Sequence, residues 1–344
     1  MTARKILGRW ETLIFGLIVV VLIIGSQLSD QFWTTASITS GSSGYVEFAI
    51  LALPLTLIIA TGEIDLSVAS VLGLSSALMG YLWNQNLPIE AIFPIVLVVG
   101  AVCGLFNGWL ITKLGLPSLA VTIATLSLFR GLAFVFLGDE SVTSFPDHYT
   151  SMAYDNFAGT IIPNTVALFL VLAIIFAVVL HRTPFGRSIF AIGANPEAAR
   201  FSGLRVNRTK LQLFVISGVM AALAGIIVTL RDSTAAGNVG TGAELTAIAA
   251  VVLGGVSIFG GTGTIGGVLL ALFLLAGIQK AIGLNPDVPT YWIQIISGAL
   301  LIGSVLVPNL ATRFRESRQV NQRRGPARSS RDVPPTIAPG TPQV

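Results

Sequence analysis

Residues 163–181 read PNTVALFLVLAIIFAVVLH and contain no Asp, Glu, Lys or Arg. A helix needs about 20 such residues, at about 1.5 Å each, to cross the hydrocarbon core of a bilayer. Similar runs recur along the 344 residues, of which 53% are hydrophobic and only 10% are charged. In a typical soluble domain about a quarter of the residues are charged. The sequence therefore predicts an all-α polytopic membrane protein whose main solvent is lipid.

Ten apolar segments are expected to cross the membrane, within a transmembrane domain that covers residues 12–310. They are 12–28, 45–62, 66–83, 91–112, 117–137, 163–181, 210–230, 244–260, 264–283 and 290–307. Residues 1–11 form a short basic segment before the first span. The run that follows is longer than a signal-peptide core, so we expect it to remain as a first membrane helix. Residues 311–344 are rich in Arg, Pro and Ser, a composition typical of a disordered tail.

The distribution of basic residues favours ten crossings with both termini in the cytoplasm. With that topology all but three of the 20 Lys and Arg residues fall on the cytoplasmic side, as the positive-inside rule expects. The three exceptions are Arg130, Arg231 and Lys280. If 45–83 were one broken crossing, the basic segment 182–210 would face outward instead.

The largest outer segment, 138–162, has no Lys or Arg, and its Pro and Gly residues favour an ordered loop with at most a short helix. Its acidic residues are candidate contacts for an external partner: Asp139, Glu140, Asp147 and Asp155.

No feature of the sequence predicts a metal, a bound cofactor or an enzyme active site in this chain. Cys103 is the only cysteine, so neither an internal disulfide nor a thiol–metal cluster can form. His148 and His181 lie too far apart for the usual ligand spacing. The Gly-rich stretch 253–267 contains no Lys or Arg and follows an apolar span, so it does not predict a phosphate loop. Nothing indicates binding to nucleic acid, and the basic tail could contact anionic lipid headgroups.

A short join between the second and third spans carries two carboxylates, Glu63 and Asp65, beside hydrocarbon, where unpaired charges cost several kcal/mol. In one interpretation Gly62 ends one helix and Asp65 or Ser67 caps the next. In the other, the turn borders a translocation path or a cytoplasmic interface.

A second join, 253–267, is rich in glycine. A tight bend between closely packed helices explains this glycine content better than a phosphate-binding loop does. Similar segments precede both joins, since 47–50 and 244–248 each begin with Glu before apolar residues. An internal duplication offset by about 197 residues would explain this similarity, and such repeats are common in transporters.

Arg130 lies within the span 117–137, where a guanidinium must face protein or water and by default indicates a functional site. Thr122 and Thr125 lie on the same helix, and together with Arg130 and Glu244 they are candidate residues of a translocation path or gate. The alternative is that Arg130 extends to the membrane surface or pairs with an acidic residue such as Glu244.

The cytoplasmic loop predicts a short, stiff helix. Asn195 is a favourable N-cap, Pro196 fits the first helical position, and Glu197 favours the positive end of the helix dipole. Gly203 would end the helix after about two turns. Such a helix can transmit force to a soluble partner, although a plain interfacial helix between spans would have the same sequence features.

Several stretches in consistent order resemble the ribose-type branch of ABC importer permeases, and the resemblance covers about 40–310. The matching stretches are 62–70 (GEIDLSVAS), 116–123 (LPSLAVTI), 130–133 (RGLA), 193–203 (GANPEAARFSG) and 253–267 (LGGVSIFGGTGTIGG). Glu63 departs from the pattern, since many relatives have a second glycine there. The form around Glu63 is similar to the rhamnose-type and autoinducer-2-type permeases in particular.

The resemblance implies a sugar importer of the bacterial cytoplasmic membrane. It implies two cytoplasmic ATPase subunits that use ATP and Mg, an external sugar-binding protein, and a second copy of the chain or a sister permease. The residues expected to form the ATPase-coupling loop are Gly193, Asn195, Glu197, Ala198, Ala199, Arg200 and Gly203. This chain has no Gly-x-x-x-x-Gly-Lys-Ser/Thr motif, so a partner must hydrolyse the ATP.

The competing class is a secondary transporter driven by H⁺ or Na⁺, which would need ionisable residues deep within the spans. The candidates lie mostly at span ends, and they are Arg130, Glu47, Glu63, Asp65 and Glu244.

Overall fold

A computed structural model gives the fold of the protein. It describes residues 4–285, 288, 289, 291–293, 295, 296, 298–300, 302, 303 and 306. The chain divides into two compact units, Met1–Ser304 and Val305–Val344. The tail expected at 311–344 lies outside the described residues, as does part of the expected span 290–307, and the description below concerns the first unit.

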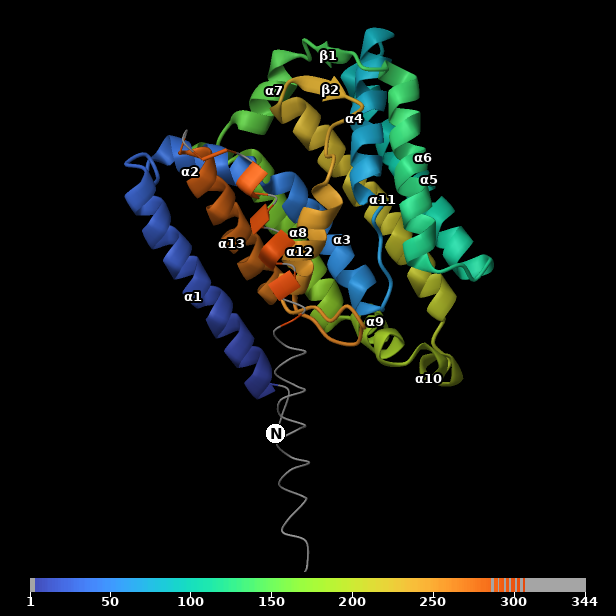
Figure 1. Ribbon diagram of the computed structural model, residues 1–344. Helices are drawn as coiled ribbons and strands as arrows, with labels where there is room; N and C mark the ends of the chain where they lie inside the picture. Colours follow the sequence, from blue (N-terminus) through green and yellow to red (C-terminus); the bar gives the residue numbers. More distant parts are fainter. Residues whose placement is uncertain are drawn as a thin grey trace, which may run out of the picture. The chain divides into compact units, whose positions relative to one another are not determined.

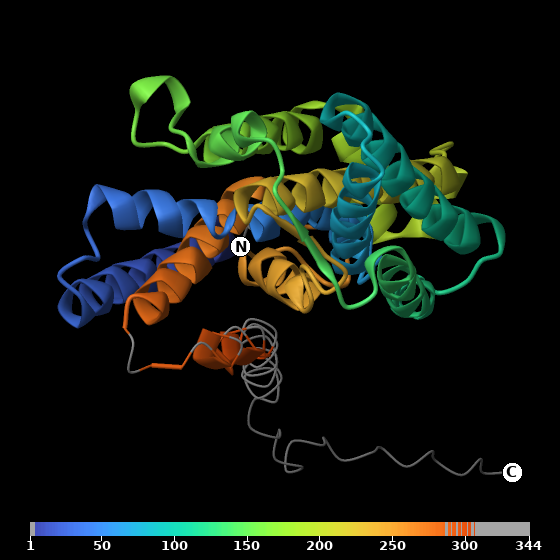
Figure 2. The ribbon, with the colours of Figure 1, turned by 90° about the horizontal axis from the view of Figure 1, so that it is seen from above.

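The first unit is a helical bundle with one small sheet (Figure 1). Its elements are α1 (Arg4–Leu28), α2 (Thr35–Ser43), α3 (Val46–Ala60), α4 (Val68–Asn84), α5 (Ile89–Lys113), α6 (Ser118–Leu137), β1 (Ser141–Thr143), α7 (Asp147–Tyr154), η1 (Phe157–Gly159), α8 (Asn164–Arg182), α9 (Pro184–Ala194), α10 (Pro196–Phe201), α11 (Val206–Arg231), β2 (Thr234–Ala236), α12 (Ala243–Leu253) and α13 (Ile265–Gly283). Helices α1 and α13 lie on one side of the bundle and α5 and α6 on the other (Figures 1 and 2).

Helices α3 and α11 form the centre of the bundle. Almost every residue of α3 is buried, and 72% of the apolar window of α11 is buried, against 17% for α1. A helix that is apolar on all sides is found inside a protein core or within a membrane. Close approach of α5 and α11 depends on glycine, because a side chain at Gly218 would overlap the backbone of Gly100.

The outer helices expose large apolar side chains that water would not accommodate as one continuous surface. Examples on α1, α5, α6 and α8 are Phe15, Val98, Val135 and Ile174. Among the described residues, six helices are long and apolar enough to cross a membrane, or seven if the bent pair α2–α3 forms one span. The chain is therefore a polytopic helical membrane protein, as the composition predicts.

Helices α3 and α12 are too short to cross alone. Their 15 and 11 residues extend about 22 Å and 16 Å, against a hydrocarbon thickness of about 30 Å. Each is followed by a non-helical segment, 61–67 or 254–264, before the next long helix begins. Helix α12 begins 197 residues after α3, and α13 begins 197 residues after α4. The matching offsets agree with the internal duplication inferred from the two Glu-containing segments.

The two ends of the bundle carry different structures. At one end, β1 and β2 pair antiparallel with Val142 opposite Ala235, next to α7 (Figure 1). Helices α9 and α10 lie at the other end. The sequence predicted an ordered loop with at most a short helix in 138–162, whereas β1, α7 and η1 all lie there. The strand could not be predicted locally, because it pairs with β2, which is distant in the sequence.

Candidate functional site

Helices α9 and α10 are each begun by a side-chain cap. The Thr183 hydroxyl accepts the Gly186 N–H at 3.2 Å, and Asn195 Oδ1 accepts the N–H groups of Glu197 and Ala198 at 3.0 Å. Proline follows each cap at the first helical position. Gly203, with φ of +84°, allows the turn after α10. The short helix expected after Asn195 is therefore present, whereas α9 was not expected.

A small apolar cluster attaches α10 to the bundle while leaving its outer face exposed. Ile192, Ala199 and Val206 are buried together, with Leu204 packed against them. Glu197, Ala198 and Arg200 are exposed, and Arg200 donates a hydrogen bond of 2.9 Å to Asn207. Phe201 is 93% exposed. Phe201 thus places one large apolar side chain on the exposed face of α10.

Gly193, near the end of α9, packs directly on the two non-helical joins. The Gly261 N–H donates to the carbonyl of Ala60, the last residue of α3, at 2.9 Å. A Cβ atom at Gly193 would overlap both the Ala60 oxygen and the Gly261 nitrogen. Residue 193 must therefore be glycine for α9 to contact the end of α3 and the segment after α12. We call this contact the glycine junction (Ala60, Gly193, Gly261).

Glu63 is neutralised by an ion pair with Lys210 near the start of α11, and the two side chains are 15% and 16% exposed. The adjoining turn is held against α6, because the Ile64 N–H donates to Ser118 Oγ at 3.2 Å and Thr122 Oγ1 donates to the Ile64 carbonyl at 3.3 Å. The turn thus connects α3, α6 and α11.

Asp65 lies at the centre of a buried polar network and is only 2% exposed. Ser67 donates to Asp65 Oδ1 through its N–H at 3.0 Å and its hydroxyl at 2.6 Å, and the Ser217 hydroxyl donates to Oδ2 at 2.8 Å. Asn107 donates to Ser67 Oγ at 2.8 Å. These donors replace the hydration that the carboxylate loses on burial. The network holds α4, α5 and α11 around the turn.

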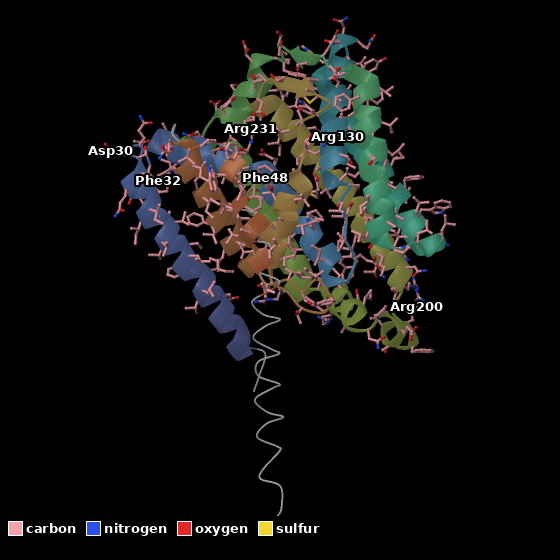
Figure 3. The ribbon with its side chains drawn as sticks, in the orientation of Figure 1. Asp30, Phe32, Phe48, Arg130, Arg200 and Arg231 are labelled. Carbon is pink, nitrogen blue, oxygen red and sulfur yellow. The ribbon has the colours of Figure 1, made fainter. Side chains whose placement is uncertain are left out.

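Arg130 donates to three backbone carbonyls and forms no salt bridge with Glu244. Its guanidinium bonds the oxygens of Gly237, Val239 and Ala69 at 2.7, 2.8 and 3.0 Å. Figure 3 shows Arg130 within the bundle. It fixes the segment between β2 and α12 against α4, which does not agree with extension to the membrane surface. Glu244 lies outside salt-bridge distance but interacts electrostatically with Arg130, so the pairing expected from the sequence is present as a charge interaction and not as a direct bond.

The other predicted residues are divided between separate regions. Thr122 and Thr125 are buried on α6, and the Thr125 hydroxyl donates to the Thr122 carbonyl at 3.5 Å. Glu244 lies in the first turn of α12. The four acidic loop residues are exposed at the end of the bundle opposite α10, and they are Asp139, Glu140, Asp147 and Asp155. In the described part of the chain no group of three His, Cys, Asp or Glu residues could hold a metal ion.

Sequence reasoning missed the partners that complete these networks. Lys210 was assigned only to the basic cytoplasmic segment, although a basic partner for Glu63 was to be expected from the cost of burying a single charge. Ser217 and Asn107 carry no local signal, because polar residues within apolar spans gain meaning only from their neighbours in space. The cap formed by Thr183 and Pro184 could have predicted α9.

Comparison with known sequences places these features in a family. The family described as "Branched-chain amino acid transport system / permease component" matches residues 37–305. The chain belongs to this permease family. It is thus a multi-pass transport protein of the cytoplasmic membrane and an ABC importer permease, as the resemblance implied, and not an enzyme.

The permease is similar over most of its length to three curated relatives, each called autoinducer 2 import system permease protein LsrD. The relative from Enterobacter sp. (strain 638) is 33% identical over 308 residues, which are 88% of this chain and 93% of the relative. That from Photorhabdus temperata is 32% identical over 321 residues, 92% and 96% of the two chains. That from Yersinia enterocolitica is 33% identical over 299 residues, 85% and 89%. No solved structure matches the permease significantly.

Proposed function

We propose that this permease forms the membrane path of an importer for a sugar-like molecule, and that ATP hydrolysis on a partner subunit drives it through α9 and α10. The observation that carries the proposal is the glycine junction. It joins α9 to the end of α3 and to the segment after α12 without an intervening side chain. Closely packed segments cannot deform continuously, so a displacement of α10 that is passed to α9 would move the end of α3 and the segment after α12.

The proposed topology has ten crossings with both termini in the cytoplasm. The segments 61–67 and 254–264 would complete the crossings that α3 and α12 begin. Non-helical backbone is tolerated at membrane depth when it is buried inside the protein. The basic residues of 182–210 then lie on the cytoplasmic side, together with the exposed face of α10.

The proposed docking surface for the ATPase comprises the exposed residues of α10 and the glycines that flank it. Phe201 is its apolar centre, and Glu197 and Arg200 provide charges at its edge. ATP and Mg would bind to the ATPase subunit alone. Closure of two ATPase subunits would pull on two such surfaces, one from this chain and one from a second copy or a sister permease. The cavity between the permeases would then open to alternate sides.

The opposite end of the bundle is the proposed contact for an external binding protein, through the exposed Asp139, Glu140, Asp147 and Asp155. The curated relatives are autoinducer 2 import permeases, which supports a small, polyhydroxylated cargo such as autoinducer 2, rhamnose or a ribose-type sugar. The gate between the two sides is proposed to include the Glu63–Lys210 pair and the Asp65 network.

Reconstitution tests this function. The permease is purified with candidate ATPase and binding-protein subunits, placed in liposomes, and supplied with labelled autoinducer 2, L-rhamnose or D-ribose. We expect uptake of at least one of them to require ATP and the binding protein, and to continue when ionophores remove all ion gradients. Uptake that depends on an ion gradient and needs no ATP would refute this function and indicate a secondary transporter.

A further inference from the structure

An open cavity of about 680 Å³, lined by both polar and apolar atoms, lies at the end of the bundle opposite α10. Its walls come from α2, the start of α3, the end of α7 and the segment after it, and the ends of α11 and α13. Its volume is within the range of about 300–1,000 Å³ that is typical of small-molecule sites. Figure 3 places two of its residues, Phe48 and Arg231, at this end of the bundle, close to α2.

One wall of the cavity contains a buried ion pair whose charges cancel. Arg231 bonds the two carboxylate oxygens of Glu47 at 2.5 and 3.2 Å, and it also donates to the Ser43 carbonyl at 2.8 Å. The Glu47 side chain is only 9% exposed. Asp232, with a side chain 51% exposed, accepts another bond of 2.9 Å from Arg231 and adds one negative charge. The charged groups of the cavity wall therefore carry a net negative charge, which disfavours anions.

Other side chains in the cavity wall are available to a ligand. Thr35, Asn156 and Gln279 line the cavity, and their side chains make no hydrogen bond to any described residue. Hydroxyl and amide groups both donate and accept, which matches the alternating needs of sugar hydroxyls. Phe48 and Tyr154 line the same cavity with aromatic rings, which can pack on the C–H faces of a sugar.

We propose that this cavity is a receiving site for a small, neutral, polyhydroxylated molecule, occupied by cargo as it leaves the binding protein. The assignment rests on the proposed import function, which supplies the cargo. A neutral polyol satisfies the free hydroxyl and amide groups without opposing Asp232, whereas an apolar ligand would leave those groups unpaired.

Protection from chemical labelling tests the site directly. Gln279→Cys places a thiol in the cavity, and Gln85→Cys places one on an exposed turn outside it as the matched control. Each complex of permease and ATPase is treated with a maleimide, with or without autoinducer 2, L-rhamnose or D-ribose. We expect the sugar that is imported to slow labelling at position 279 at least about fivefold and to leave position 85 unchanged.

Uptake by the same complexes separates this proposal from the proposed function. ATP-driven import without protection of position 279 would overturn the receiving site and leave the importer intact. Protection without import would support the site and overturn the import function. Neither protection nor import would overturn both. In addition, Gln279→Met should lower uptake about fivefold at limiting cargo, as the loss of one hydrogen bond predicts, while Gln85→Met should not.

Discussion

The glycine junction predicts that a single methyl group at residue 193 impairs transport. In Gly193→Ala the added Cβ would overlap the Ala60 carbonyl oxygen and the Gly261 amide nitrogen, both backbone atoms that cannot rotate away. Either α9 moves outward or the Gly261–Ala60 hydrogen bond opens. Both changes weaken the connection between α9 and the end of α3 and the segment after α12.

The magnitude follows from two contributions. Overpacking of a well-filled site costs about 1–3 kcal/mol. Loss of one buried backbone hydrogen bond adds about 1 kcal/mol. Gly193→Ala should therefore lower the free energy of unfolding by about 1–3 kcal/mol when α9 moves outward and the hydrogen bond is kept, and by up to about 4 kcal/mol when the bond opens. Gly266→Ala is the matched control, because residue 266 is helical and a Cβ there meets nothing within 4 Å. It should change stability by less than about 0.5 kcal/mol.

Two measurements test this prediction. Denaturant unfolding of the purified permease in mild detergent, followed by circular dichroism, gives the stability difference between the two variants. Reconstituted complexes give the number of cargo molecules imported per ATP hydrolysed, which should fall severalfold in Gly193→Ala at nearly normal ATPase activity. A Gly193→Ala protein with the stability and transport ratio of the Gly266→Ala control would refute the mechanical role of the junction.

Three further variants test other contacts. Glu63→Gln leaves Lys210 without its partner and should lower the free energy of unfolding by about 3 kcal/mol. The double variant Glu63→Gln with Lys210→Met should lose clearly less than the sum of the two single variants. Additive losses would argue against a coupled pair. Arg130→Met leaves three carbonyls without a donor, so hydrogen exchange should rise selectively in residues 237–242; unchanged protection there would contradict the role of Arg130. Asn195→Ala removes the cap of α10 and should destabilise that helix by about 1 kcal/mol. The variant should import fewer cargo molecules per ATP but still insert into the membrane. An unchanged number of cargo molecules per ATP would count against α10 as the element that transmits the motion.

The helical class and the family could be predicted from the sequence, because the length of an apolar run and a short motif both depend only on residues that are neighbours in the chain. The same holds for the start of α10, since Asn195, Pro196 and Glu197 are neighbours in sequence. The end of α12 was less predictable. The apolar run 244–260 resembles one span, but the helix ends at Leu253, and glycine density indicates a bend without fixing its position.

Contacts between distant residues could not be predicted in the same way. Lys210 and Glu63 are 147 positions apart, and Ser217 and Asp65 are 152 apart. Apolar periodicity says which side of a helix is buried and not which helix packs against it. The cost of burying a charge does predict that Glu63 and Asp65 have partners, although it does not name them.

The most direct test of the account is the side of the membrane on which α10 lies. Phe201→Cys, in a Cys103→Ser background, introduces a thiol at a position that is 93% exposed. We predict that a membrane-impermeant maleimide labels this thiol only after the cells are permeabilised, and that the partner ATPase blocks the labelling. Labelling in intact cells would place α10 on the outer face, and an ATPase could then not drive the permease through it.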